Sequence, residues 1–450
     1  MRVLMVSDVY FPRVNGVSTS IETFRRTLAA QGVELRLVAP RYGGEPDEAG
    51  VVRVAGWPVP GDREDRLVGW RAMHRATLAA AGGCDLVHIQ TPFVAHYAGL
   101  AAARRLGLPV IATYHTLFEE YLQHYAPLLP AGWLKRRARG LSRRQCNALD
   151  GVIVPSTAMR ERLLGYGVDA PLHVLPTGIP VERFRGRDGA AFRRQHGIAP
   201  ERPVALFVGR VAHEKNIGFL LDALRHALAR HPALLLLIAG EGPARAELEA
   251  RVRREGLAEA VRFIGYLDRA EALPACYAAA DVFVFASRTE TQGLVLLEAM
   301  AAGLPEVALA EMGTVDILGP GRASLAPPPE PAAFADALAG LLDDGVALRR
   351  LAAEAPVYAA EWSDAEMAAR LARLYREMLE RGAAEALPAA AGARAAPPGG
   401  TGAGRGQGPL SGGSKGNGPL ARPVWRGGEG RAWARPAAAL TPCGRSRRRS

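Results

Sequence analysis

Residues 287–305, SRTETQGLVLLEAMAAGLP, begin at the end of the apolar stretch DVFVFAS and decide the fold of this 450-residue chain. The pattern predicts a buried strand, a loop and a helix of roughly eleven residues, about 16 Å long at 1.5 Å per residue. Gly303 just past the helix and Pro305 two residues later are typical of a helix end.

Two acidic residues in this stretch do not fit a plain core helix. Glu290 lies in the loop, and Glu298 interrupts the apolar runs LVLL and AMAA on the buried side of the helix. A buried carboxylate needs a hydrogen-bonding partner, and a sugar diol would donate two hydroxyls. The free N–H groups of the first turn, near Gln292, Gly293 and Leu294, would face an anion such as a pyrophosphate. The alternative is a capped helix with one internally satisfied Glu.

The Glu-x7-Glu spacing followed by AMAAGLP resembles the donor-site motif of the retaining glycosyltransferases of the GT-B fold, and among them family 4. The resemblance covers about residues 1–381. It implies an α/β protein in which two Rossmann-like parallel domains face a cleft and a C-terminal helix crosses back to the first domain. The expected divisions are an acceptor-side domain (1–176), a nucleotide-sugar-binding domain (177–362), the returning helix (363–381) and a disordered basic tail (382–450).

Composition is that of a soluble globular protein, with 49% hydrophobic and 22% charged residues. The four cysteines are scattered without a Cys-x-x-Cys pair, which suggests neither a disulfide framework nor a zinc site and fits a reducing cytoplasm. Asp8 comes too early for a signal peptide, and no apolar run approaches a membrane span of about 18 residues. Any membrane contact is therefore expected to be peripheral.

The net charge of +11 is concentrated in the tail. Residues 383–450 contain eleven Lys and Arg against two Glu, so the preceding 382 residues carry only +2. The folded part therefore gains nothing from charge as a nucleic-acid binder, and no specific nucleic-acid partner is expected. Lacking periodicity and apolar content, the tail is predicted to be disordered, and its role stays open.

The chain opens with a predicted buried strand, RVLMVS, a loop and a helix that Gly32 closes. The loop lacks GxGxxG, so a dinucleotide site is not indicated. Gly16 would let a ligand approach the carboxyl end of the strand, although a simple turn glycine explains it about as well. In similar glycosyltransferases Asn15 and Gly16 lie against the donor phosphates and the acceptor. A family histidine near the donor sugar corresponds to His115, which by position alone reads as an ordinary capped histidine.

The sequence TYHTLFEEYLQHYAPLLP, residues 113–130, looks like that of the bacterial enzymes that glycosylate diacylglycerol and of relatives acting on other lipids. Six cations then fall between Lys135 and Arg144, with Leu134, Ala138 and Leu141 at helical spacing among them and Trp133 at the edge. A basic amphipathic helix binds anionic membranes, at about 1 kcal/mol per cation. The alternative is a solvated basic helix. Membrane attachment is the working hypothesis, at the inner face of the plasma membrane.

The second domain opens with RPVALFVGRVAHEKN, where a strand feeds Gly209, Arg210 and Lys215. Two fixed cations suit a leaving diphosphate, and the resembling family holds the donor phosphates at these positions. The segment ending in Tyr266 resembles the one that meets the nucleotide base through its backbone. Uridine and guanosine are not distinguished by this segment.

Three further expectations concern the chain's architecture. Residues 176–178 look like an interdomain hinge. Residues 357–380 predict one long amphipathic helix, with Trp362 where the chain turns back to the first domain. Glu306, where the family has a small apolar residue, opens a strand and is expected to reach solvent.

Together these features predict metal-independent transfer of a hexose, from UDP-glucose in preference, to a lipid such as diacylglycerol, with retention. No Asp-x-Asp motif is present, and neither a metal nor another cofactor is expected. The alternatives are a soluble, lipopolysaccharide or phosphatidylinositol acceptor with GDP-mannose or another donor, and a non-catalytic binding module. The expected catalytic residues are His115, Arg210, Lys215 and Glu290, and the expected substrate-binding residues are Asn15, Gly16, Gly209, Tyr266, Gln292, Gly293, Leu294 and Glu298.

Overall fold

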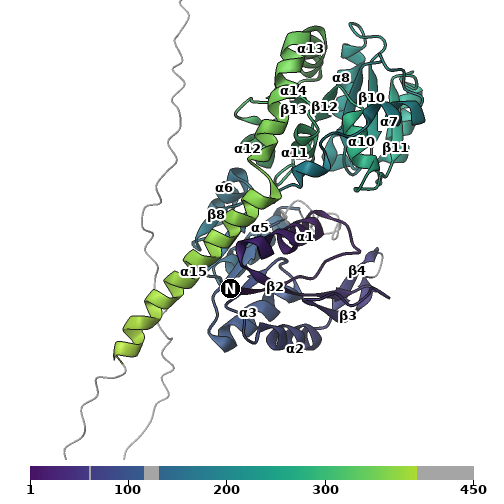
Figure 1. Ribbon diagram of the computed structural model, residues 1–450. Helices are drawn as coiled ribbons and strands as arrows, with labels where there is room; N and C mark the ends of the chain where they lie inside the picture. Colours follow the sequence, from purple (N-terminus) through teal and green to yellow (C-terminus); the bar gives the residue numbers. More distant parts are fainter. Residues whose placement is uncertain (60–61, 116–130, 393–450) are drawn as a thin grey trace, which may run out of the picture. The chain divides into compact units, whose positions relative to one another are not determined.

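The computed structural model describes residues 1–59, 62–115 and 131–392 of the chain (Figure 1). Its first domain is built on an eight-stranded sheet of order β4-β3-β2-β1-β5-β6-β7-β8, parallel except for the β3–β4 pair. The strands are β1 (Arg2–Val6), β2 (Glu34–Arg41), β3 (Val51–Val59), β4 (Asp62–Val68), β5 (Leu86–Ile89), β6 (Val110–Thr113), β7 (Gly151–Val154) and β8 (Leu172–Val174).

Helices cover both faces of this sheet, because its central strands are apolar on both sides. One core layer joins the sheet to α1 (Gly16–Leu28) and to the C-terminal helix α15 (Asp364–Gly392). The other layer includes side chains of α2 (Trp70–Ala81), α3 (Val94–Leu106), α5 (Ala131–Cys146) and α6 (Thr157–Gly165).

The second domain has a six-stranded, fully parallel sheet of order β11-β10-β9-β12-β13-β14. Its strands are β9 (Val204–Val208), β10 (Leu235–Ala239), β11 (Val261–Gly265), β12 (Val282–Phe285), β13 (Glu306–Ala308) and β14 (Ser324–Leu325). The helices are α7 (Gly189–Gln195), α8 (Ile217–Ala227), α9 (Arg245–Arg254), α10 (Ala272–Ala278), α11 (Leu294–Ala301), α12 (Val315–Leu318), α13 (Pro331–Asp343) and α14 (Gly345–Ala360). The predicted α/β class with two Rossmann-like domains is confirmed.

The predicted single helix over 357–380 is wrong. α14 ends at Ala360, and α15 begins at Asp364 after a tight turn that contains Trp362. α15 then packs on α1 and the first sheet, where Met367, Leu371 and Tyr375 are buried (Figure 1). It continues to Gly392, so the expected disorder from residue 382 is also wrong for the first eleven tail residues; 393–450 lie outside the described residues.

Glu306 is buried completely, contrary to the expectation that it reaches solvent. It opens β13, whose two neighbours β12 and β14 enclose it, with Phe283 and Ser324 as its register partners. Neither carboxylate oxygen finds a hydrogen-bond partner among the described residues. Burial without a partner raises the pKa of Glu306 well above its usual value.

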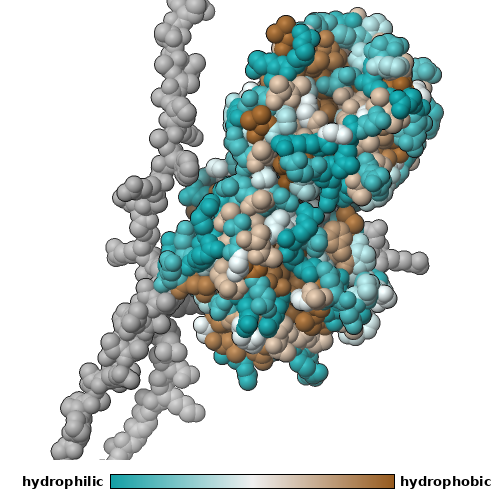
Figure 2. All heavy atoms as spheres, viewed as in Figure 1, coloured by the Kyte–Doolittle hydropathy of each residue, from teal (hydrophilic) through white to brown (hydrophobic). Residues whose placement is uncertain are grey.

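The viewed face of the molecule is mainly hydrophilic, with scattered apolar residues (Figure 2). Within the described ranges, none of the helices combines the length and apolarity needed to cross a bilayer. The three described cysteines, Cys84, Cys146 and Cys276, are buried free thiols, as their spacing predicts.

Candidate active site

Two loops of the second domain are tied together at the carboxyl ends of the adjacent strands β9 and β12. The amide Nδ2 of Asn216 donates to the carbonyl of Ala286 at 3.2 Å, and Oγ of Ser287 donates to the carbonyl of Glu214 at 3.2 Å. Open α/β sheets bind ligands at this edge. The two sequence stretches that carry the expected donor residues therefore form one structural unit.

This unit brings together Lys215 and Glu290, which lie 75 residues apart in sequence. The ammonium Nζ of Lys215 donates to Oε1 of Glu290, and the two side chains are only 21% and 17% exposed. Each charge neutralises the other in a half-enclosed setting, where an unpaired charge would be costly. Lys215 ends a short 3₁₀ turn, and Asn216, at φ 55°, redirects the chain into α8.

Arg210 lies at the rim of the same unit. Its side chain is 62% exposed and reaches Glu214 at 3.9 Å. The neighbouring backbone is closely packed, because a Cβ added at Gly240 would stand 1.9 Å from the carbonyl oxygen of Gly209. Gly240 therefore lets the loops after β9 and β10 meet at Gly209, the residue before Arg210.

Glu298 lies in α11 and is 2% exposed, as its position among apolar residues predicts. Its two oxygens have protein partners: the guanidinium of Arg269 donates to Oε1, and the hydroxyl of Tyr277 donates to Oε2 at 3.0 Å. The buried carboxylate is thus satisfied internally. Since an ionised carboxylate accepts about four hydrogen bonds, it retains capacity for ribose hydroxyls.

Arg269 and Tyr277 were missed by the sequence reasoning. Arg269 sits in the loop after β11, in the run LDRAE, which reads as an ordinary polar turn. Tyr277 lies in an apolar helix and reads as core, where it is indeed fully buried. The only available signal was the unexplained charge of Glu298, which requires a cation or donors nearby without saying which.

The start of α11 links the site to the predicted hinge. The side chain of Gln292 is buried and makes two hydrogen bonds with the backbone of Thr177, accepting from its N–H at 2.8 Å and donating to its carbonyl at 2.7 Å. Gly293 caps the helix at φ 96°, a conformation that favours glycine, and Leu294 is the first helical residue. That the N–H groups here bind an anion remains a prediction.

Tyr266 follows β11 and is 65% exposed. Arg269, whose guanidinium pairs with Glu298, lies three residues further along the same loop. The residues expected to meet the base and the ribose therefore flank one arginine.

In the first domain, Asn15 accepts a hydrogen bond from the N–H of Ser18 at 2.9 Å and so caps α1. A Cβ on Gly16, the first residue of that helix, would meet no described atom within 4 Å, so the expected room for a ligand is open. His115 follows β6 and is partly buried, with Nε2 at 3.0 Å from Oε1 of Gln90. Desolvation lowers the pKa of His115 to about 4, so the imidazole is neutral at physiological pH.

The basic helix α5 departs in one respect from the expected amphipathic pattern. Leu134 and Ala138 are buried against the domain, whereas Leu141 and Trp133 are exposed apolar residues, at 43% and 42%. The membrane-binding apolar stripe expected at Leu134, Ala138 and Leu141 is thus wrong for two of its members. The cations face outward, namely Arg136, Arg137, Arg139, Arg143 and Arg144, with Lys135 partly buried.

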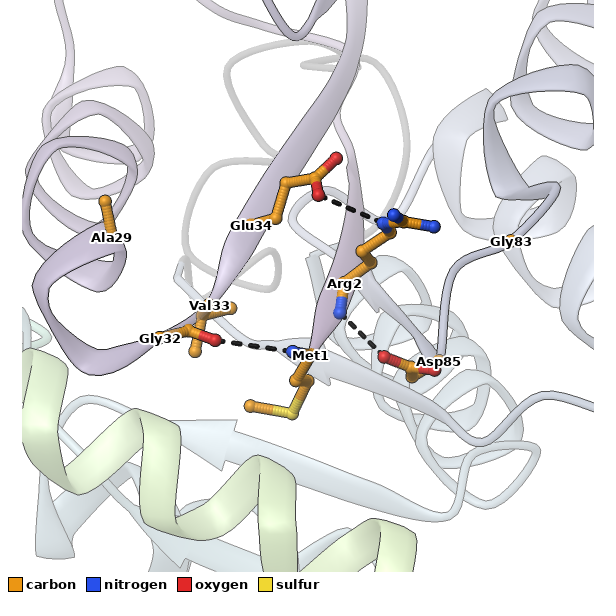
Figure 3. A pocket seen from close by; sticks show the side chains of 8 residues that line it. All are labelled: Met1, Arg2, Ala29, Gly32, Val33, Glu34, Gly83 and Asp85. Carbon is orange, nitrogen blue, oxygen red and sulfur yellow. Dashed lines mark hydrogen bonds and ion pairs between the residues drawn. The ribbon is translucent and has the colours of Figure 1, made fainter.

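A shallow pocket lies elsewhere, at the amino ends of β1 and β2 (Figure 3). Its walls are held by Arg2, whose Nε donates to Glu34 at 3.0 Å and whose N–H donates to Asp85 at 2.7 Å. It contains none of the predicted site residues and opens at the opposite end of the strands. We assign it no role in the chemistry.

Comparison with known proteins identifies the family of the chain. The family described as Glycosyltransferase Family 4 matches residues 14–183, and Glycosyl transferases group 1 matches residues 188–357. The chain is 32% identical over 318 residues to the alpha-monoglucosyldiacylglycerol synthase of Streptococcus pneumoniae (strain ATCC BAA-255 / R6), covering 68% of this chain and 71% of that protein. It is 31% identical over 346 residues to a GDP-mannose-dependent alpha-mannosyltransferase of Mycobacterium tuberculosis (strain CDC 1551 / Oshkosh), covering 72% and 83%.

Among solved structures, Anabaena Alr3699/HepE in complex with UDP has the same fold, with a TM-score of 0.67 at 19% identity over 84% of this chain and 100% of that one. The two parallel α/β domains and these matches define a GT-B glycosyltransferase. The chain belongs to glycosyltransferase family 4, with its second domain in glycosyl transferases group 1. The predicted hexosyltransferase class is confirmed.

Proposed function

We propose that this enzyme transfers a hexose from a nucleotide sugar, UDP-glucose in preference, to diacylglycerol, with retention at the anomeric carbon and without a metal ion. The observation that carries the proposal is the Lys215–Glu290 pair, followed in sequence by buried Glu298 in α11. The chain is also similar, over 68% of its length, to a protein named alpha-monoglucosyldiacylglycerol synthase.

The leaving nucleoside diphosphate needs stabilisation as negative charge develops on it. Lys215 and Arg210 supply two cations at one loop, and the first turn of α11 supplies backbone N–H groups. Their combination takes the electrostatic role that a metal ion has in other enzymes. Lys215 would exchange its contact with Glu290 for a donor phosphate oxygen, which frees Glu290 for hydroxyls of the donor sugar.

The transfer itself needs no protein nucleophile. The acceptor hydroxyl oxygen bonds to the anomeric carbon on the face from which the diphosphate oxygen departs, and its proton passes to a phosphate oxygen of that leaving group. His115 would contact the sugar beside the reacting carbon as a neutral imidazole. Glu298 would bind the ribose, and Tyr266 would lie beside the base.

A lipid acceptor is favoured by the outward cations of α5. An anionic surface would attract them at about 1 kcal/mol each, and Trp133 and Leu141 would enter the interfacial region. Trp133 is already stacked beneath Arg137, whose guanidinium carbon lies 5.0 Å from the ring centroid. The enzyme would thus act peripherally at the cytoplasmic face of the membrane.

The second candidate is mannosyl transfer from GDP-mannose to a different lipid or a soluble acceptor. It is supported by the comparable similarity to a protein named GDP-mannose-dependent alpha-mannosyltransferase. The two candidates share the same cationic loop and differ at the base contact near Tyr266.

The deciding experiment is mass spectrometry of lipids after the purified protein has been incubated with UDP-glucose, EDTA and anionic vesicles that contain diacylglycerol. The proposal predicts a hexosyl-diacylglycerol. A hexosyl product that forms only from GDP-mannose would support the second candidate. Neither glycolipid nor released nucleotide with either donor would contradict both.

A further inference from the structure

Two side-chain hydrogen bonds, here called polar rungs, connect β5 and β6 on the sheet face covered by α1 and α15. His88 Nε2 lies 2.7 Å from Oγ1 of Thr113, and Gln90 lies beside His115. Both rungs join residues 25 apart in sequence, so the second repeats the first one strand period further along. The first rung is anchored in the core, since His88 Nδ1 lies 2.7 Å from the hydroxyl of buried Tyr375.

The second rung ends at the carboxyl edge of the sheet, where the site lies. Gln90 is 3% exposed, and its Oε1 lies 3.0 Å from Nε2 of His115. A carboxamide oxygen only accepts hydrogen bonds, so Nε2 of His115 carries the hydrogen. The other ring nitrogen, Nδ1, is then the acceptor of the neutral imidazole.

The remaining half of the Gln90 side chain is unsatisfied. Its amide Nε2 is buried and has no hydrogen-bond partner among the described residues. An unpaired buried donor costs about 1–3 kcal/mol, and native proteins keep few of them. A donor of this kind next to His115, at the ligand-binding edge of the sheet, points to an oxygen that arrives with the substrate.

We propose that Gln90 is a positioning and binding residue: its Oε1 fixes the orientation and tautomer of His115, and its NH₂ group donates to a hydroxyl oxygen of the donor hexose. This inference rests on the proposed function. It names the hexose, not the diphosphate, as the ligand of Gln90.

The test is calorimetric binding of UDP-glucose and of UDP to the wild type and to Gln90→Leu. Loss of one hydrogen bond to the sugar weakens UDP-glucose about tenfold and leaves UDP unchanged. Equal weakening of both would assign Gln90 to the diphosphate and overturn the inference. Thr113→Val is the matched control, because it removes the other rung; it is expected to lower the melting temperature without changing the ratio of the two affinities.

A second variant distinguishes a role of Gln90 in positioning His115 from a role in packing alone. Gln90→Glu keeps the shape but places a carboxylate beside Nε2 of His115, which stabilises the imidazolium. The acid limb of the pH profile of kcat/KM should move upward by about one pH unit or more, whereas Gln90→Leu should lower kcat/KM without moving it. An unmoved acid limb in Gln90→Glu would overturn the link to His115.

The proposed function and the role of Gln90 can be refuted separately. A wild type that binds neither UDP-glucose nor UDP, and neither GDP-mannose nor GDP, overturns the proposed function and this inference together. If the wild type makes a glycolipid and Gln90→Leu still binds the sugar nucleotide and the free nucleotide in the wild-type ratio, only the inference is overturned. If the donor proves to be GDP-mannose, the same comparison uses GDP-mannose and GDP.

Discussion

Lys215 and Glu290 form the ion pair on which the proposed donor site depends. Each is an ion-pair partner of the other, so both charges are compensated in the half-enclosed loop. Under the proposed function, donor binding would exchange this ion pair for two new contacts, which would limit the desolvation cost of binding. The two residues should therefore act as a unit.

Substitution of Lys215 by alanine removes the cation nearest the expected diphosphate. Loss of such an electrostatic contact costs about 10²–10³ in kcat, because it is strongest when the leaving group gains charge. Steady-state kinetics with saturating UDP-glucose would measure it. Arg230→Ala, which removes an exposed cation paired with Asp343, is the control. Wild-type kcat in Lys215→Ala would contradict the assignment.

Glu298→Gln tests the ribose contact. Hydrogen bonds to an ionised carboxylate are roughly twice as strong as those to a neutral amide. The substitution also deprives Arg269 of its counter-charge. We expect KM for the donor to rise about tenfold with a smaller change in kcat. Glu259→Gln, at an exposed position, should leave both constants unchanged, and an unaltered donor KM in Glu298→Gln would refute the role.

Buried Glu306 is expected to make the stability of the protein depend on pH. Its pKa is raised in the folded protein, so the folded state holds a proton that the unfolded state releases above about pH 4.5. Stability is therefore greatest below the unfolded pKa and declines as pH rises through the folded pKa. Glu306→Gln removes this dependence, and Glu306→Val also removes the unpaired polar group, which is worth about 1–3 kcal/mol.

Thermal melts at pH 5 and pH 8 would check this. Both variants should melt several degrees above the wild type at pH 8, and the difference should shrink at pH 5. Glu259→Gln again serves as the control. A Glu306→Val protein that melts below the wild type at pH 8 would mean that the carboxyl has a stabilising partner.

At the scale of elements, the proposed membrane contact concerns α5, whose arginines are exposed. Replacing Arg136, Arg137, Arg143 and Arg144 by Gln removes four outward charges, or about 4 kcal/mol of attraction to an anionic surface. Sedimentation with anionic vesicles should fall sharply, and wild-type binding should itself weaken with salt.

The matched control replaces four exposed arginines on other helices, Arg253, Arg254, Arg349 and Arg350. It makes the same change in net charge and should keep most of the binding. If both quadruple variants lose binding equally, the effect is one of net charge. Unchanged sedimentation of the α5 variant would remove the membrane role of this helix and leave the chemistry standing.

Elements with a local signal could be predicted, and those set by distant contacts could not. The strand, loop and stop around α11 follow from apolar periodicity and from Gly303 at φ 84°. The β3–β4 hairpin was not foreseen, because β3 alternates between exposed and partly buried residues and has a proline near its end. The turn at Trp362 was predicted, but the break in the helix there was not, because the apolar spacing continues from α14 into α15.

In the candidate site too, residues with a local sequence signal could be predicted and those placed by distant contacts could not. Glu290, Glu298 and Lys215 stand out as charges placed where a core or a turn would not need them. The partners of Glu298 and His115 look ordinary, because only the fold brings them together: Arg269 and Tyr277 with Glu298, and Gln90 with His115. The fate of Glu306 was misjudged for a related reason: a strand start reaches solvent only if no strand flanks it on both sides.

At the scale of the whole molecule, the hinge and the donor site share one residue. Gln292 holds both backbone groups of Thr177, and the hydroxyl of Thr177 donates to Oγ of Ser20 in α1 at 2.8 Å. Under the proposed function, we expect a change at the start of α11 on donor binding to reach the segment between the domains through these hydrogen bonds. Domain closure that excludes water would limit hydrolysis of the donor.

The most direct test of the central claim is the anomeric configuration of the product. We would isolate the glycolipid formed from UDP-glucose and diacylglycerol and measure the coupling of its anomeric proton by NMR. The account predicts the α-anomer, as in the donor, formed in the presence of EDTA and nearly abolished in Lys215→Ala. A β-linked product, or a product that requires a divalent metal, would contradict it.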